Sequence, residues 1–214
     1  MNINIGNIRR EYTKGGLNEK DTPSDPFDLF EHWLEEAINA KANEPTAMLV
    51  ATVSPEGRPS ARTVLLKELK EGKFIFYTNY NSRKGKHIAA TPFVALSFVW
   101  HELERQVHIE GAVEKLPPEI SDAYFKTRPY KSRIGARISP QSQPIRSRSE
   151  IVKHFIRESM RTFPKEVERP ANWGGYAVTP VRIEFWQGRE SRLHDRILYT
   201  LEQDGNWKKQ RLAP

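Results

Sequence analysis

The segment "SRLHDR" at 191–196 gathers two arginines, a histidine and an aspartate directly after the aromatic run "IEFWQGRE". Successive side chains of an extended strand point to opposite faces, so Arg192, His194 and Arg196 would share one face. Hydrogen-bond donors beside the upstream Trp186 suit a planar, anionic ligand. A solvated, salt-bridged edge strand is the alternative interpretation.

A second basic group occurs in "NSRKGKHIA", where Ser82 can cap a helix that begins with Arg83 and Lys84. A helix N-terminus offers free backbone N–H groups and the positive end of the helix dipole, and both favour phosphate. An exposed basic helix start is the alternative. The G-x-x-x-x-G-K-[ST] sequence of a P-loop is absent.

Two further pairs could hold anions. Arg62 and Lys67 in "RTVLLK" are five residues apart. An odd offset in a regular strand sends them to opposite faces, which predicts different anionic groups or different ends of one site. Tyr124 and Arg128 are four residues apart on one predicted helix, so a phenol and a guanidinium can converge on one anion. Ser132 follows in the loop after that helix.

The composition excludes several chemistries. The chain has no cysteine, so thiolate nucleophiles, disulfides and cysteine-based metal sites are absent. The six histidines show neither H-x-x-x-H nor H-E-x-x-H spacing, and there is no G-x-S-x-G nucleophile elbow. We therefore predict no metal site and no hydrolytic centre.

The 214 residues, with 37% hydrophobic and 29% charged, are typical of a soluble globular protein. The net charge of +7 should attract anions such as phosphorylated small molecules, nucleic acid or an acidic membrane. The basic residues are dispersed and match no nucleic-acid recognition motif, which argues against nucleic acid. No apolar run approaches the roughly 20 residues of a membrane span, and we expect a cytoplasmic protein.

The elements that must position these residues can be read from the periodicity. We expect a mobile N-terminal arm over 1–23 and one domain over 24–214. Helical patterns occupy 24–45, 81–91, 117–128 and 147–163, with Asp25 as the N-cap of the first. Strand patterns occupy 46–53, 60–69, 73–80, 93–100, 104–116, 174–187, 195–203 and 206–212. This order predicts an α+β, mainly β fold: an antiparallel barrel with helices packed outside it.

A set of motifs then occurs in a specific order: "REYTKGGL", "RTVLLK", "FYTNYNSRKGKHI", "LERQVHIEG", "YFKTRP", "QSQPIRSR", "WGGY", "IEFWQGRESRLHDR" and the terminal "RLAP". From about residue 9 to the C-terminus the chain resembles the pyridoxine/pyridoxamine 5′-phosphate oxidase family. Each motif alone is weakly specific, whereas the ordered set is highly specific.

The resemblance implies an FMN-dependent homodimer with a split β-barrel fold and the flavin at the subunit interface. It also implies oxidation of pyridoxine 5′-phosphate or pyridoxamine 5′-phosphate to pyridoxal 5′-phosphate. O2 is the electron acceptor and gives H2O2, and the amine substrate also releases ammonia.

The resemblance further implies which residues contact each ligand. The flavin ligands would be Arg62, Lys67, Tyr77, Thr78, Arg83, Lys84, Gln106, Gln141, Ser142, Trp186 and Arg196, some of them from the second subunit. The substrate ligands would be Lys67, Tyr124, Arg128, Ser132, Arg192 and His194, together with Arg9, Arg10, Glu11 and Tyr12 of the arm. Arg83 and Lys84 would hold the flavin phosphate, and Lys67 and Arg128 would hold the substrate phosphate.

Arg192, His194 and Arg196 would act in catalysis. Arg196 would stabilise the reduced flavin ring, Arg192 would lie over the substrate ring, and His194 would bind its hydroxyl. One residue departs from the family, because Arg137 in "IGARISPQS" replaces the usual tryptophan. The rival functions are a flavin reductase or another oxidase on the same fold, and a non-catalytic binder of flavin or pyridoxal phosphate.

Overall fold

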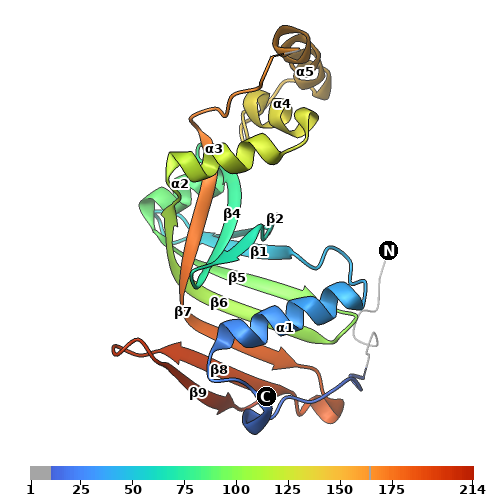
Figure 1. Cartoon of the computed structure of the whole chain (residues 1–214), viewed down its shortest axis with the longest axis vertical. Helices are drawn as coiled ribbons and strands as arrows, with labels where there is room; N and C mark the ends of the chain where they lie inside the picture. Colours follow the sequence, from blue (N-terminus) through green and yellow to red (C-terminus); the bar gives the residue numbers. More distant parts are fainter. Residues whose placement is uncertain (1–10, 164) are drawn as a thin grey trace. The chain divides into compact units, whose positions relative to one another are not determined.

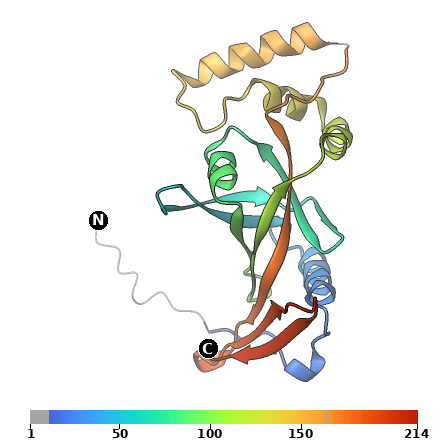
Figure 2. The same ribbon diagram turned by 90° about the vertical axis from the view of Figure 1, so that its left-hand side faces the viewer.

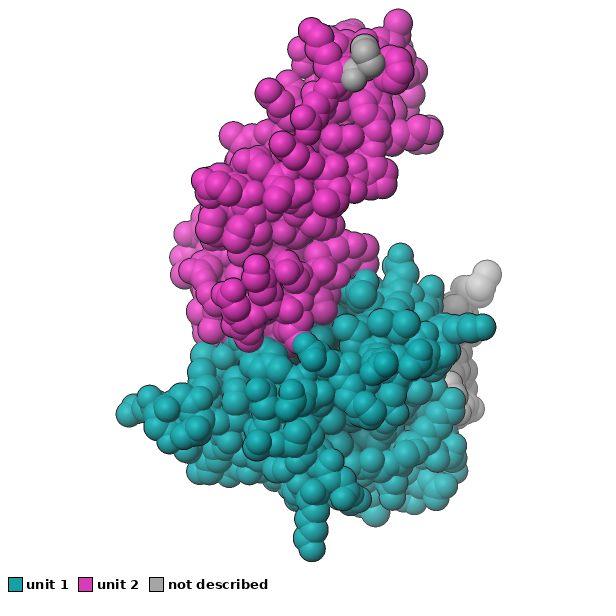
Figure 3. All heavy atoms as spheres, in the orientation of Figure 1, with its two compact units in different colours: residues 1–49, 95–110, 180–214 teal, residues 50–94, 111–179 magenta. Residues whose placement is uncertain are grey.

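The computed structural model describes residues 11–163 and 165–214, which form two compact units (Figure 3). Of the described residues, unit 1 comprises 11–49, 95–110 and 180–214, and unit 2 comprises 50–94, 111–163 and 165–179. Arg9 and Arg10 lie outside the described residues. The prediction of a single domain over 24–214 stays a prediction.

Five α-helices and nine β-strands make up the described part of the chain (Figure 1). The helices are α1 (Pro26–Asn39), α2 (Arg83–Ala90), α3 (Pro118–Thr127), α4 (Tyr130–Ile138) and α5 (Arg148–Thr162). The strands are β1 (Ala47–Val53), β2 (Pro59–Leu65), β3 (Glu68–Lys70), β4 (Lys73–Asn79), β5 (Phe93–Trp100), β6 (Arg105–Lys115), β7 (Trp173–Gln187), β8 (Asp195–Leu201) and β9 (Trp207–Leu212).

All nine strands belong to one sheet with the order β2-β1-β5-β6-β7-β4-β3, and β8 joins it through β7 and β9 through β8. The pairs β3–β4, β4–β7, β7–β8 and β8–β9 are antiparallel. The predicted α+β, mainly β class with antiparallel strands is therefore confirmed. No helix of the described residues combines the length and apolar character that a membrane crossing requires.

In unit 1, helix α1 begins where the sequence predicts. The Asp25 side chain accepts a hydrogen bond from the backbone N–H of Phe27 (2.8 Å), and Pro26 occupies the first helical position. The buried face of α1 packs on the sheet through aromatic pairs, with Phe30 5.0 Å from Phe98 between ring centroids. Strands β8 and β9 form an antiparallel hairpin next to β7 (Figure 2).

In unit 2, the Ser82 side chain caps α2 by accepting a hydrogen bond from the N–H of Gly85 (3.3 Å). Gly85 has to be a glycine, because a Cβ there would lie 2.1 Å from the carbonyl oxygen of Tyr80. That close approach draws the helix start against the end of β4, and so it places Lys84 near the strand.

The structure corrects three local expectations. The predicted strand 60–69 is interrupted, since β2 ends at Leu65 and β3 begins at Glu68. Lys67 lies between the two strands, and its backbone N–H donates a hydrogen bond to the carbonyl of Ile75 (2.9 Å). Ser132 lies in helix α4 and not in a loop. Segment 191–196 is not extended throughout, because a 3-10 turn spans Glu190–Arg192 before β8 begins.

Candidate functional site

A cleft of about 550 Å³ in unit 2 contains three cationic side chains: Lys67, Lys84 and Arg128. No aspartate or glutamate lines it in the described part of the chain. Its lining comes from β2, β4, α2, α3, α4, the start of β7 and the loops next to these elements: Thr63, Val64, Leu65, Lys67, Tyr77, Thr78, Lys84, Tyr124, Thr127, Arg128, Pro129, Ser132, Gln141 and Trp173. A cleft with this charge should bind anions.

Lys84 is 8% exposed, and its ammonium donates to Thr78 Oγ1 (3.0 Å) and Gln141 Oε1 (3.0 Å). Burial lowers the pKa of Lys84 from 10.5 to about 8, and the nearby charge of Arg62 contributes to the same shift. A buried ammonium whose partners are both neutral is a strong candidate to pair with an anionic ligand.

Thr78 and Gln141 are joined to each other as well, because Thr78 Oγ1 lies 3.2 Å from Gln141 Oε1. Gln141 follows α4, so this contact brings the segment after α4 to the end of β4. Ser142 comes next and is exposed, with a left-handed backbone (φ 68°). Thr78, Lys84 and Gln141 are therefore brought together as a set, and Ser142 lies beside them in sequence.

The rings of Tyr77, Tyr124 and Trp173 are stacked. The Tyr77 and Tyr124 centroids are 3.8 Å apart with a 14° angle between planes, and Tyr77 lies 5.5 Å from Trp173. Burial raises the pKa of Tyr77 to about 12, so its phenol stays neutral at physiological pH. The stack gives the cleft a rigid aromatic wall.

Arg128 lies over this wall, with its guanidinium carbon 4.5 Å from the Trp173 ring centroid. Its Nη1 is buried and has no hydrogen-bond partner among the described residues. Burial lowers the pKa of Arg128 below its usual range. An unpartnered, buried guanidinium nitrogen in a cationic cleft is suited to donate a hydrogen bond to a phosphate oxygen.

Tyr124 and Arg128 both line the cleft, as expected, but they do not share a helix face as the four-residue spacing predicts. Helix α3 ends at Thr127, and Arg128 is its C-cap with an extended backbone (ψ 146°). Ser132 reaches the same cleft from α4. The structure thus brings together Lys67, Tyr124, Arg128 and Ser132.

Arg62 does not belong to the lining of this cleft. Its guanidinium donates to the carbonyl of Val50 (3.0 Å), Thr52 Oγ1 (2.8 Å) and Ser60 Oγ (2.6 Å). Arg62 and Lys67 have different environments, but the odd-offset argument does not apply to them, because β2 ends at Leu65 before Lys67 is reached. Arg83, at the start of α2, is exposed.

In unit 1 the structure groups Tyr12, Trp186 and His194. The Trp186 ring centroid is 5.7 Å from that of Tyr12 and 4.6 Å from that of His194. The Tyr12 and His194 rings meet edge to face at 5.6 Å. A pocket of about 520 Å³ beside them is lined by Tyr12, Thr13, Gly15, Arg189, Glu190, Ser191, Leu193 and Asp195.

Segment 191–196 presents its side chains differently from the predicted strand. Ser191 and Arg192 both have left-handed backbones, with φ values of 55° and 62°. His194 Nδ1 accepts a hydrogen bond from the N–H of Arg189 (3.1 Å), which folds the turn back on itself. The alternation that would align Arg192, His194 and Arg196 therefore does not apply, and Arg192 is exposed.

Arg196 lies on β8, where it forms a bidentate pair with Glu184 of β7, at 2.8 Å and 3.1 Å. This pair raises the pKa of Arg196. Gln106 on β6 is half-buried and contacts His108 (3.2 Å). Glu11 is exposed.

Sequence reasoning missed two residues at these sites. Trp173 is part of the aromatic wall, and in the sequence only its place in the "WGGY" motif indicates that it belongs to the site. Glu184 pairs with Arg196 from a neighbouring strand, and no spacing in the sequence indicates that pair. Among the described residues, no group of histidine, aspartate and glutamate could hold a metal ion.

The fold and the cleft define a mainly β, antiparallel-sheet protein with a cleft lined by three cationic side chains. The family described as "Pyridoxamine 5'-phosphate oxidase" matches residues 34–160. The family described as "Pyridoxine 5'-phosphate oxidase C-terminal dimerisation region" matches residues 173–214. The chain belongs to the pyridoxamine 5′-phosphate oxidase family.

Curated relatives and solved structures agree with this membership. A pyridoxine/pyridoxamine 5′-phosphate oxidase of Bacteroides thetaiotaomicron is 67% identical over 211 residues, which cover 99% of each chain. One of Porphyromonas gingivalis is 60% identical over 214 residues, which cover all of both chains. PhzG from Burkholderia lata, solved with tetrahydrophenazine-1-carboxylic acid, has a TM-score of 0.86 and 29% identity, covering 91% of this chain and 95% of that one.

A pyridoxamine 5′-phosphate oxidase-related, FMN-binding protein from Nostoc punctiforme has a TM-score of 0.74. It is 17% identical and covers 90% of this chain and all of its own, so the likeness concerns the fold alone. These structures confirm the predicted split-barrel class.

Proposed function

We propose that this protein is an FMN-dependent oxidase that converts pyridoxine 5′-phosphate and pyridoxamine 5′-phosphate to pyridoxal 5′-phosphate. The alcohol is oxidised to the aldehyde while O2 is reduced to H2O2. The amine additionally consumes water and releases ammonia. Family membership supports this activity, and curated relatives of the same length carry its name.

The observation that carries the proposal is the cleft that Lys67, Lys84 and Arg128 share. The predicted ligand of the flavin phosphate, Lys84, and the predicted ligands of the substrate phosphate, Lys67 and Arg128, line one cavity. Two phosphate esters bound at such a cleft would hold their rings near each other, as a reaction between two ring systems requires.

The residues present fit FMN. Lys84 has neutral partners and can pair with the phosphate, while Thr78 and Gln141 offer polar side chains beside it. The remaining predicted ligands in unit 2 are Arg62, Tyr77, Arg83 and Ser142, with Lys67 shared between the ligands. When bound, FMN accepts the electrons of the substrate and passes them to O2.

For the substrate, we propose that Arg128 binds the phosphate through its buried, unpartnered Nη1, with Lys67, Tyr124 and Ser132 completing the clamp. The clamp argues against a flavin reductase, which needs no pocket for a second phosphate. It also predicts that unphosphorylated pyridoxine is a poor substrate.

We further propose a homodimer in which Gln106, Trp186 and Arg196 complete the flavin site from the second subunit. The family match over 173–214 is to a dimerisation region. Leu49 on β1 and Val99 on the neighbouring β5 are each 44% exposed, and exposed apolar side chains on adjacent strands are typical of an interface.

The catalytic roles follow from charge. The bidentate pair with Glu184 fixes the orientation of the Arg196 guanidinium, which carries positive charge at all working pH values and would stabilise negative charge on a reduced ring. His194 and Arg192 would hold the ring and hydroxyl of the substrate. Glu11 and Tyr12, with Arg9 and Arg10, would cover it.

The test is turnover of the purified, FMN-loaded protein. We expect pyridoxal 5′-phosphate and H2O2 to form from either phosphorylated substrate, with little product from unphosphorylated pyridoxine at the same concentration. A protein that binds FMN and either phosphate ester but forms no product would favour the non-catalytic binder.

A further inference from the structure

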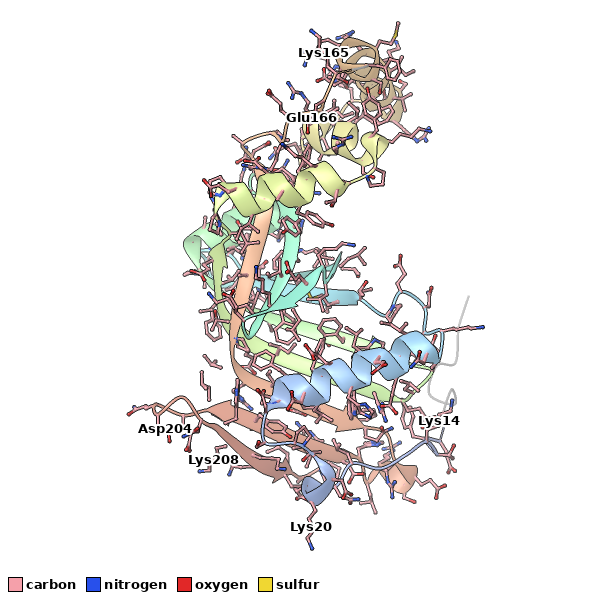
Figure 4. The ribbon with its side chains drawn as sticks, viewed as in Figure 1. Lys14, Lys20, Lys165, Glu166, Asp204 and Lys208 are labelled. Atoms are coloured by element: carbon pink, nitrogen blue, oxygen red, sulfur yellow. The ribbon has the colours of Figure 1, made fainter. Side chains whose placement is uncertain are left out.

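A buried carboxylate in unit 1, that of Glu104, holds the backbone of Thr13 and Lys14. Glu104 is 3% exposed, and its Oε2 accepts hydrogen bonds from the N–H groups of Thr13 (2.9 Å) and Lys14 (3.0 Å). Lys14 is labelled in Figure 4. One oxygen thus satisfies two successive backbone donors, and such charge-assisted contacts are the strong kind.

Further side chains hold the same stretch. Gln187, itself 1% exposed, donates to the carbonyl of Lys14 (2.8 Å). The N–H of Leu17 donates to Asp195 (3.0 Å), and its carbonyl accepts from Arg211 (2.8 Å). Residues 13–17 are therefore held mainly through backbone groups, and the Lys14 ammonium adds a hydrogen bond to the carbonyl of Glu102 (2.7 Å).

The conformation of Glu104 itself is unusual. It ends the turn between β5 and β6 with a left-handed backbone (φ 56°), which is unfavourable for a residue other than glycine, asparagine or aspartate. Its carbonyl accepts from the N–H of Gly188 (2.7 Å). Strained backbone of this kind persists where the surrounding structure requires it, which points to a role for this side chain.

The anchored stretch begins one residue after Tyr12. The Tyr12 ring meets Trp186 and His194 edge to face, at 5.7 Å and 5.6 Å between centroids. It also lies so close to Gly188 that a Cβ there would be 2.8 Å from Tyr12 Cγ. The peptide that Glu104 fixes therefore determines where the phenol ring can lie.

We propose that Glu104 is a positioning residue, which holds Tyr12 against Trp186 and His194 and so closes one side of the substrate site. This inference rests on the proposed oxidase function. Loss of the carboxylate removes the hydrogen bonds at the N–H groups of Thr13 and Lys14, so Tyr12 is held less firmly and bound substrate escapes more readily. KM should rise more than kcat falls, because the reacting groups themselves are untouched.

The test compares Glu104→Ala with Glu102→Ala. Glu102 is exposed in the same turn, and its carboxylate accepts from the N–H of Asn43 (3.1 Å), so it is a matched control. We expect Glu104→Ala to raise KM for pyridoxine 5′-phosphate about 10-fold or more, with bound FMN retained. Hydrogen exchange at the amides of Thr13 and Lys14 should accelerate to a similar degree. Glu104→Gln keeps an acceptor oxygen, so its KM and its exchange rates at these two amides should lie between those of the wild type and of Glu104→Ala.

A double variant separates positioning from a general structural effect. In a Tyr12→Ala background, Glu104→Ala should raise KM no further, because the ring it positions is already missing. Equal increases in both backgrounds would overturn the inference, as would an unchanged KM in an active Glu104→Ala protein. A wild-type protein that oxidises neither substrate would overturn the proposed function itself. If Glu104→Ala fails to fold, Glu104→Gln in both backgrounds decides.

Discussion

Replacing Lys84 with methionine removes an ammonium group that the fold buries beside neutral partners. Burial and the charge of Arg62 lower the pKa of Lys84 from 10.5 to about 8. Between these two values the unfolded chain binds a proton that the native protein does not bind. The free energy of unfolding of the flavin-free wild type should therefore rise with pH across this range, relative to the Lys84→Met variant.

The size of the effect follows from the displacement of the pKa. At about 1.4 kcal/mol per pH unit, a change in pKa from 10.5 to about 8 corresponds to at most about 3.5 kcal/mol, and screening by solvent reduces it. Urea denaturation of the two flavin-free proteins from pH 7 to pH 10 measures the difference directly. The exposed Lys86→Met variant on the same helix should show no such trend.

The affinity for FMN is a second measurement that tests the role of Lys84. A phosphate dianion favours the charged amine, so FMN binding should take up a proton above pH 8, and affinity should fall as pH rises through that value. At pH 7, Lys84→Met should weaken FMN binding about 10- to 150-fold. A stability difference that is flat with pH, or an unchanged affinity for FMN, would refute this reasoning.

Two further perturbations test the cleft and its scaffold. Arg128→Ala should raise KM for either phosphorylated substrate about 10- to 150-fold while the protein retains its flavin, and replacement of the exposed Lys126 by alanine should leave KM unchanged. Steady-state kinetics measure both values. An Arg128→Ala protein that loses flavin but has a normal KM would show that Arg128 binds the flavin phosphate and not the substrate phosphate. Gly85→Ala should lower the free energy of unfolding by about 1–3 kcal/mol, since its Cβ would lie 2.1 Å from the Tyr80 carbonyl. Gly135→Ala is the control, because a Cβ at Gly135 meets nothing within 4 Å in the described part of the chain, and it should leave the free energy of unfolding unchanged or raise it by about 1 kcal/mol. Chemical denaturation that gives the same loss of free energy for both variants would contradict this account.

Local signals predicted most of the elements. The Asp25 cap, Pro26 and the apolar spacing of α1 all act within a few residues, and the Ser82 cap of α2 does the same. Strand patterns in β4 to β7 are long and bounded by turns, which is why their predicted limits agree closely with the structure.

Helix α4 was missed because its stability comes from distant contacts. Its sequence "YKSRIGARI" is rich in polar residues and contains a glycine. Only Ile134 is fully buried, against Phe125, Val167 and Trp173. Tertiary packing, not local propensity, makes this stretch a helix.

The turn at 190–192 was missed for a different reason. Ser191 and Arg192 adopt left-handed backbones, yet neither is a glycine or asparagine, so the sequence carries no turn signal there. The N–H of Leu193 donates to the carbonyl of Glu190 (3.1 Å) and closes the turn.

The sequence predicted which residues belong to the candidate site better than it predicted how they are arranged. The cations and the phenols could be named from ordered motifs. The stack of Tyr77, Tyr124 and Trp173 joins β4, α3 and β7, which are far apart in sequence, and the pair of Glu184 with Arg196 crosses two strands. Contacts of this kind depend on the register of the sheet, which residue types alone do not specify.

The central claim is that one cleft holds a flavin and a phosphorylated substrate so that electrons pass between them. Anaerobic addition of pyridoxine 5′-phosphate to the yellow, FMN-loaded protein tests this most directly. We predict that the flavin absorbance bleaches and that air restores it. A protein that takes up no FMN, or that stays yellow at saturating substrate, would contradict the account.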